Sequence, residues 1–236
     1  SVLDSEVGGG GTNKVTADKL TIVATGSGAA IGATGAVIET TAAELILSTQ
    51  FNGGTSGAIW IDDKTTATTT LTATTDGDST VTSGLINITS AASLSIASVS
   101  SVGSTTGNLV TLATTKNGGT IDDATAGIDV VVDISGTTVT LDSQGNIGAT
   151  GDGEELDISA TVLDITTADN AGAAGTSGTM FIQELSATDT KLTLDTEDVT
   201  NSGAIFIDSA GSLTIDAIAS GGGITSVNTV TLLTTK

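Results

Sequence analysis

The chain of 236 residues contains an internal repeat with a spacing of about 120 residues. Four segments of the first half return in the second half, in the same order and at offsets of 116 to 121 residues. The pairs are residues 31–35 (IGATG) with 147–151 (IGATG), 55–61 (TSGAIWI) with 176–182 (TSGTMFI), 83–96 (SGLINITSAASLSI) with 202–215 (SGAIFIDSAGSLTI), and 110–116 (VTLATTK) with 230–236 (VTLLTTK). Low complexity alone does not preserve such an order. The repeat therefore predicts two units, residues 1–116 and 117–236, that form one continuous structure.

Within each unit, apolar and polar residues alternate in short stretches that are bounded by Gly, Asn, Asp or Ser. Examples are residues 58–61 (AIWI), 128–130 (IDV) and 204–207 (AIFI), and such stretches recur about every 24 residues. This alternation predicts short strands with one buried face, and no stretch shows the periodicity of a helix. We therefore predict an all-β chain folded as a parallel β-helix (a β-solenoid) of about ten coils of roughly 24 residues.

The composition agrees with a solenoid of this kind. Proline is absent, and a strand that donates hydrogen bonds on both sides, as nearly every strand of a solenoid does, does not tolerate proline. The net charge is −21, but 38% of the residues are hydrophobic, which is not the composition of a disordered chain. No apolar run approaches the roughly 18–20 residues of a membrane-spanning helix, so we predict no membrane span.

The missing residue types exclude several classes of function. The six basic residues are all lysines, and arginine, histidine, cysteine and tyrosine do not occur. Nucleic-acid binding needs clustered basic residues and usually aromatic rings for stacking, so no nucleic-acid partner is expected. Catalytic triads and metal sites that depend on histidine or cysteine cannot be built. We predict that the protein is not an enzyme.

Residues 201–215 (NSGAIFIDSAGSLTI) carry a resemblance to a known family. This stretch, and residues 83–96 with it, resembles the repeat of filamentous-haemagglutinin-type and giant adhesin β-helices, in which Gly and an apolar-x-apolar triplet precede Ala-Gly-x-Leu-x-Ile. The coils predicted here are longer than that family's repeat, and its secretion domain is missing. The resemblance implies a β-solenoid exported to the cell surface. Because the chain begins without Met or a signal peptide, we expect a processed product or a fragment.

Adjacent acidic residues are the first candidates for chemistry. Neighbouring carboxylates occur at Asp62–Asp63, Asp122–Asp123, Glu154–Glu155 and Glu197–Asp198. Adjacent residues of a strand point to opposite faces, so such neighbours do not converge as the acid and base of a glycosidase. We interpret them as solvated acids at the corners of the coils.

Calcium is the only cofactor that the sequence leaves open. Asp76 and Asp78 flank one glycine, and Asp152 and Glu154 flank another, which is a local arrangement that hard-oxygen sites use. Neither stretch continues into an EF-hand loop. These four residues are the candidate metal ligands, and a slender rod of charge −21 would gain from a bound divalent cation.

Two further binding functions stay open. Threonines at 68–70, 72 and 74–75 could order water as an ice-binding face does, although the second unit interrupts the pattern with Asp189, Lys191 and Asp195. Residues 87–89 (NIT) form an N-glycosylation sequon, and surface glycans are possible partners of an adhesin-like rod. Polysaccharide binding and ice binding are therefore kept as alternatives.

The remaining expectation is a structural role. The chain stops at Lys236, the same phase of the repeat at which the first unit runs into the second at Lys116. An open end of a β-helix presents unpaired backbone groups, so we predict head-to-tail stacking of copies into an extracellular filament. The alternatives are an excised stalk segment of a giant adhesin, and donation of residues 1–7 to a neighbour on the flexible arm formed by glycines 8–11.

Overall fold

The computed structural model describes residues 1–3, 14–51, 53–77, 83–103, 108–125, 131–150, 155–168, 177–197, 202–221 and 229–235. Within these ranges the secondary structure consists of 17 strands, without a helix. The strands are β1 (Lys14–Thr25), β2 (Ile38–Gln50), β3 (Ile59–Asp63), β4 (Thr69–Asp76), β5 (Ile86–Ser90), β6 (Leu94–Val102), β7 (Leu109–Thr114), β8 (Ile121–Asp123), β9 (Ile134–Ser135), β10 (Thr138–Ser143), β11 (Leu156–Ser159), β12 (Val162–Ala168), β13 (Met180–Glu184), β14 (Thr190–Glu197), β15 (Ile205–Ser209), β16 (Leu213–Gly221) and β17 (Val230–Thr234). No helix among the described residues is therefore available to cross a membrane.

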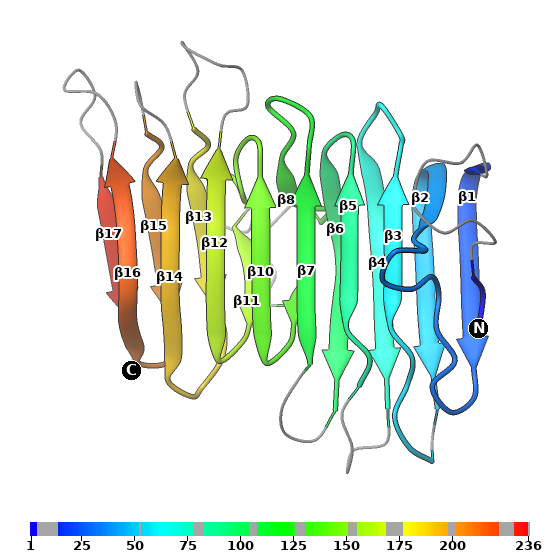
Figure 1. Cartoon of the computed structure of the whole chain (residues 1–236). Coiled ribbons are helices and arrows are strands. Elements are labelled where there is room, and N and C mark those ends of the chain that lie inside the picture. Colours follow the sequence, from blue (N-terminus) through cyan, green and yellow to red (C-terminus); the bar gives the residue numbers. More distant parts are fainter. Residues whose placement is uncertain are drawn as a thin grey trace.

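The strands form a parallel β-solenoid, which confirms the predicted fold class (Figure 1). The chain alternates between two stacks of parallel strands. Stack A contains β3, β5, β7, β10, β12, β14 and β16. Stack B contains β4, β6, the pair β8 and β9, β11, β13, β15 and β17. The long strand β2 reaches both stacks, because its first residues pair with β3 and its last residues with β4.

The solenoid has fewer and longer coils than we predicted. One inward row of aliphatic side chains marks each passage of the chain through stack A: Ile31, Ile59, Ile86, Val110, Val139, Leu163, Leu192 and Ile215. The row spans seven turns of about 26 residues each, and the bridge of Val2 to Ile31 adds one more layer to the stack, which makes nine layers rather than about ten coils of 24 residues. Successive members are 23 to 29 residues apart, because the connections at the corners differ in length. The stretch at residues 128–130 lies outside the described residues.

The two repeat units lie on the solenoid with a half-turn between them. In the first unit β3, β5 and β7 belong to stack A, whereas their equivalents in the second unit, β13, β15 and β17, belong to stack B. Conversely, β4 and β6 of the first unit belong to stack B, whereas their equivalents β14 and β16 belong to stack A. One unit therefore closes four and a half turns, not a whole number.

The core is a set of aliphatic rows that run along the axis. Ile59, Ile61, Ile86, Ile88 and Leu112 are typical members and are almost completely buried. In each row, the side chain of one coil stacks on the equivalent side chain of the next coil, so every coil depends on its neighbours for burial. Figure 1 shows which strands lie at the ends of the stacks: β1 forms one end of the rod, and β16 and β17 form the other.

Candidate functional site

The adjacent acidic residues Asp62 and Asp63 lie on opposite faces of one strand. In β3, Asp63 points inward and is buried, whereas Asp62 lies outside, where its Oδ2 is 2.5 Å from Nζ of Lys64. The two side chains point to opposite faces of the strand, which confirms our prediction that these neighbours do not converge. Our interpretation of Asp63 as a solvated acid is wrong, because this residue is buried. The signal was present, since Asp63 has the same strand parity as Ile59 and Ile61. Glu154 and Asp198, and the side chain of Glu197, lie outside the described residues.

Asp63 and Glu184 are equivalent in the two repeat units, and both are completely buried. The Asp63 carboxylate accepts hydrogen bonds from the hydroxyl groups of Thr69, at 2.7 Å, and Thr65, at 2.8 Å. The Glu184 carboxylate accepts one from the Ser209 hydroxyl at 3.0 Å. The Asp63 carboxylate also accepts hydrogen bonds from the Thr40 and Ser90 hydroxyl groups of the coils on either side, so both acids join neighbouring coils.

A third group of acids lies where the first unit meets the second. Asp133 is buried just before β9, and Asp123 and Asp157 are its acidic neighbours. Burial raises the pKa of Asp133 to about 7, the backbone N–H of Asp157 opposes this shift with a hydrogen bond of 2.9 Å, and the two neighbouring carboxylates add to it. Burial also raises the pKa of Asp122.

The structure does not assemble the four calcium candidates. Asp76 is half-buried at the end of β4, and Asp78, Asp152 and Glu154 lie outside the described residues. Among the residues that are described, no group of three or more acidic side chains is arranged to hold a metal ion. Calcium binding stays a prediction.

The threonine stretch is confined to one strand. Thr70, Thr72 and Thr74 point outward from β4, in alternation with buried residues. Their partners on the two neighbouring strands are Glu44, Ile46 and Ser48 of β2 and Ser95, Ser98 and Ser100 of β6. A regular array of threonines over successive coils is therefore not formed here. Asn87 of the sequon lies half-buried in β5, between Trp60 and Thr111 of the adjacent strands.

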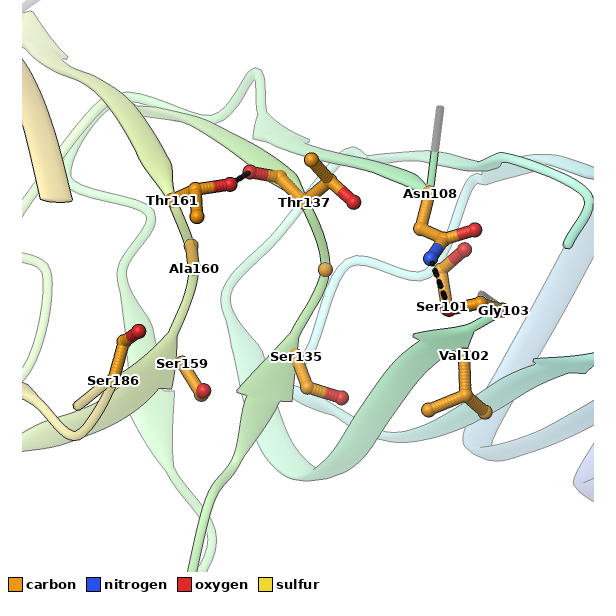
Figure 2. Close-up of a pocket in the computed structure, with 11 residues that line it drawn as sticks. Ser101, Val102, Gly103, Asn108, Ser135, Thr137, Ser159, Ala160, Thr161 and Ser186 are labelled. Atoms are coloured by element: carbon orange, nitrogen blue, oxygen red, sulfur yellow. Dashed lines mark hydrogen bonds between the residues drawn. The ribbon is translucent and has the colours of Figure 1, made fainter. Parts of the chain in front are cut away.

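A shallow depression of about 330 Å³ follows one corner of the solenoid (Figure 2). Hydroxyl groups dominate its lining, with Ser101 from β6, Ser135 from β9 and Ser159 from β11. At its rim the Thr161 hydroxyl donates a hydrogen bond of 2.8 Å to the backbone oxygen of Thr137. Charged and aromatic side chains are absent from this lining, so the depression offers hydrogen bonds but no acid, base or stacking surface.

Two phenylalanines form a second surface feature. The rings of Phe181 in β13 and Phe206 in β15 stack on the outer face, with centroids 5.0 Å apart and planes 7° from parallel. Together with Leu233 of β17 they border a hollow of about 260 Å³. Trp60 is the equivalent of Phe181 in the first unit, but it pairs with Asn87, so the aromatic pair occurs in the second unit only.

The two ends of the rod are the most unusual surfaces among the described residues. There, β1 pairs with β2 alone, β16 with β14 alone and β17 with β15 alone. Eight of the eleven exposed large apolar side chains lie on these end coils: Val2, Leu3, Val15 and Val23 at the N-terminal end, and Ile215, Val230, Leu232 and Leu233 at the C-terminal end. Unpaired strand edges that carry apolar side chains are surfaces for association. We take the two end coils as the candidate functional site.

Our sequence interpretation located the C-terminal half of this site and missed the other half. Residues 230–236 were identified through their match to 110–116. The strand β1 was not identified, although Leu20, Ile22 and Ala24 alternate with more exposed residues.

In comparisons with known proteins, no family model, no curated protein and no solved structure matches the chain.

Proposed function

We propose that this chain is a non-enzymatic structural protein of the cell surface, whose solenoids join head to tail into a filament. The observation that carries the proposal is the pair of apolar, unpaired ends. A β-solenoid end offers a ready template for a further strand of another chain, with main-chain hydrogen bonds for affinity and side-chain rows for specificity.

The internal repeat shows what such an end looks like when it is covered. Val230 and Leu232 of β17 are 44% and 36% exposed, whereas their equivalents Val110 and Leu112 of β7 are 1% and 0% exposed. The difference arises because β10 pairs with the edge of β7 that corresponds to the free edge of β17. The same sequence therefore forms core in the middle of the rod and exposed apolar surface at its end, and covering that surface favours association.

The chemistry of the side chains supports a structural role. Histidine, cysteine and arginine are absent from the chain. Asp63 and Glu184, the most deeply buried carboxylates among the described residues, accept hydrogen bonds from neighbouring coils. The polar side chains that line the depression of Figure 2 carry hydroxyl groups, apart from one amide, Asn108.

The charge supports growth along the axis. A net charge of −21 makes rods repel one another side by side, whereas the end coils offer apolar contacts that offset this repulsion over a short distance. The resemblance of residues 83–96 and 202–215 to adhesin repeats supports an extracellular location. In the alternative function, a stalk segment of a giant adhesin, further coils of one longer chain cover the same edges.

Light scattering and electron microscopy of the purified chain test this proposal. We expect the mean particle mass to rise with protein concentration, and micrographs to show unbranched rods many times longer than one molecule. Single molecules of constant mass at every concentration would contradict head-to-tail assembly.

A charged substitution at one end supplies the matched control. Leu232→Lys introduces a charge on the exposed edge of β17 and should abolish assembly, while circular dichroism shows the strand content of the parent chain. Ala187→Lys makes the same change of charge at an exposed corner between β13 and β14, and should assemble as the parent does. Equal assembly of both variants would show that the C-terminal edge is not the contact.

A further inference from the structure

We infer that the first coil of a second copy sits on the last coil in one defined register, with Val2 on Leu213, Val15 on Ile218, Leu20 on Val230 and Ile22 on Leu232. This inference rests on the proposed function and names the surface of the partner. The register follows from the junction between the two repeat units, where the chain makes the equivalent contact within itself.

At the internal junction, the last coil of the first unit is covered by the first coil of the second. Leu94 and Val99 of β6 pair with Ile121 of β8 and Ile134 of β9. The neighbouring strand β7 is covered by β10, and the inward pairs there are Val110 with Val139 and Leu112 with Leu141. All eight of these side chains are buried, so the contact is a complete layer of core.

The C-terminal end of the rod repeats one side of this junction. The strands β16 and β17 correspond to β6 and β7 at offsets of 119 and 120 residues. A backbone irregularity is repeated with them: the ladder of β4 with β6 shifts register after Leu71, and that of β14 with β16 shifts after Leu192. The equivalence is thus one of backbone geometry as well as sequence. The inward residues of the C-terminal end that correspond to Leu94, Val99, Val110 and Leu112 are therefore Leu213, Ile218, Val230 and Leu232, in this order.

The N-terminal end repeats the other side of the junction. Val2 forms a bridge to Ile31 and accepts a hydrogen bond from the Gly32 N–H, as Ile121 does with Ile147 and Gly148. Both glycines adopt a positive φ, 70° in Gly32 and 64° in Gly148, so the turn is the same.

The strand β1 completes this equivalence. It pairs with β2 along its whole length, as β9 and β10 together pair with β11 and β12. Leu20 pairs with Leu45, and Val139 pairs with Leu163, the equivalent of Leu45. The edge of β1 that faces away from β2 therefore corresponds to the edge of β9 and β10 that covers β6 and β7.

A pair of outward apolar side chains, one on each end coil, supports the same register. Val23 and Leu233 point outward and are 53% and 55% exposed, which is unusual for large apolar side chains on the sides of this rod. The register places them opposite each other across the junction. Their equivalents, Asp142 and Ala113, are paired in the internal junction. A pair of two apolar side chains between copies thus replaces a pair of one acidic and one small apolar side chain within the chain.

The half-turn between units makes the register compatible with a straight filament. Two units together complete nine turns, which is a whole number. The first coil of the second copy therefore continues both stacks of the first copy without an extra rotation of half a turn. In stack A the nine layers of one molecule are Val2, Ile31, β3, β5, β7, β10, β12, β14 and β16.

Cysteine cross-linking tests the register directly, because the chain has no cysteine of its own. Thr21 of β1 and Thr231 of β17 are outward residues that the register makes partners. Their Cα atoms would lie about 5 Å apart, within the range for a disulfide. We expect a chain with Thr21→Cys and a second chain with Thr231→Cys, when mixed and mildly oxidised, to form a covalent dimer that is lost on reduction.

Thr229→Cys, mixed with Thr21→Cys, is the off-register control. Thr229 has the same parity as Thr231 but lies two residues away, which places the Cα atoms about 8 Å apart, too far for a disulfide. Filaments whose Thr21→Cys chain cross-links to Thr229→Cys, or to neither partner, would overturn the register and leave the proposed function intact. Absence of both filaments and cross-links would overturn the proposed function itself.

Discussion

At the scale of single residues, inward threonines explain how this chain buries polar groups in a narrow core. Five of them donate hydrogen bonds to glycine backbone oxygens at the corners of the coils. The pairs are Thr49 with Gly57 and Thr75 with Gly84, each at 2.6 Å, Thr114 with Gly119 at 2.9 Å, Thr167 with Gly178 at 2.7 Å, and Thr196 with Gly203 at 3.4 Å. A backbone oxygen that is buried at a corner needs a hydrogen-bond donor, and the short threonine side chain supplies one within the narrow core.

The acidic residue Asp133 makes stability depend on pH. Because its pKa is raised from 3.8 to about 7 by burial, the folded chain holds a proton there that the unfolded chain releases. Its contribution to the free energy of unfolding is therefore fully present below about pH 4 and is lost as the pH rises to about 7. Asp133→Asn should leave stability unchanged at pH 4 and raise it at pH 8.

Urea unfolding of the parent and of Asp133→Asn at several pH values measures this effect. Asp164→Asn, which removes an exposed carboxylate from β12, corrects for the general loss of negative charge. An equal pH dependence in the parent and in Asp133→Asn would contradict the assignment of the buried proton to Asp133.

At the scale of the elements, glycines set the distance between successive corners. The residues Gly57, Gly84, Gly178 and Gly203 precede β3, β5, β13 and β15, and a Cβ atom on any of them would overlap a backbone oxygen of the preceding coil. The close approach lets each strand start directly above its neighbour, so the aliphatic rows stay in register. This explains why a Ser-Gly dipeptide introduces so many of the strands.

We predict that Gly84→Ala destabilises the solenoid by about 3 kcal/mol, because the overlapping atom is the backbone oxygen of Gly57 and cannot move without shifting a coil. Gly53→Ala is the control, since the nearest atoms to its added methyl group belong to the Phe51 ring, which can rotate away. Denaturant midpoints compare the two variants. Equal stability of both would show that the corner has more room than the backbone indicates.

At the scale of the whole molecule, the half-turn between units determines the shape of an assembly. Because one unit closes four and a half turns, equivalent surfaces of successive units lie on opposite sides of the rod. The aromatic pair of the second unit, Phe181 and Phe206, therefore lies in stack B, whereas Trp60, the equivalent of Phe181, lies in stack A. Only two units together return each surface to the same side.

This geometry predicts the axial spacings of the filament. Nine strand layers at about 4.8 Å give a repeat of about 43 Å, with a weaker spacing near 22 Å from the similar units. Fibre diffraction or cryo-electron microscopy should show these values together with the strand spacing. Head-to-tail filaments with an axial repeat of a different number of layers would exclude the proposed register.

Most of the secondary structure and part of the site followed from sequence patterns. Strands such as β3, β5 and β15 were predicted because their alternation and their glycine corners are local signals. The strand β1 was missed because the outward Val23 interrupts its alternation, and because the match of residues 20–22 (LTI) to 139–141 (VTL) in the other unit is only three residues long. The burial of Asp63 was readable from parity, but two of its hydrogen-bond partners, Thr40 and Ser90, come from the neighbouring coils and lie 23 and 27 residues away in the sequence.

What the amino-acid sequence determined was the class of structure: short parallel strands, two similar units and a side-chain inventory without histidine, cysteine or arginine. The tertiary structure alone decided how many turns one unit closes, and hence which residues meet at the junction between units. The number of turns depends on the length and path of every corner connection, which are small differences added over many coils. An alternating pattern says which side of a strand is buried, but only the closed coil decides which strand lies above it.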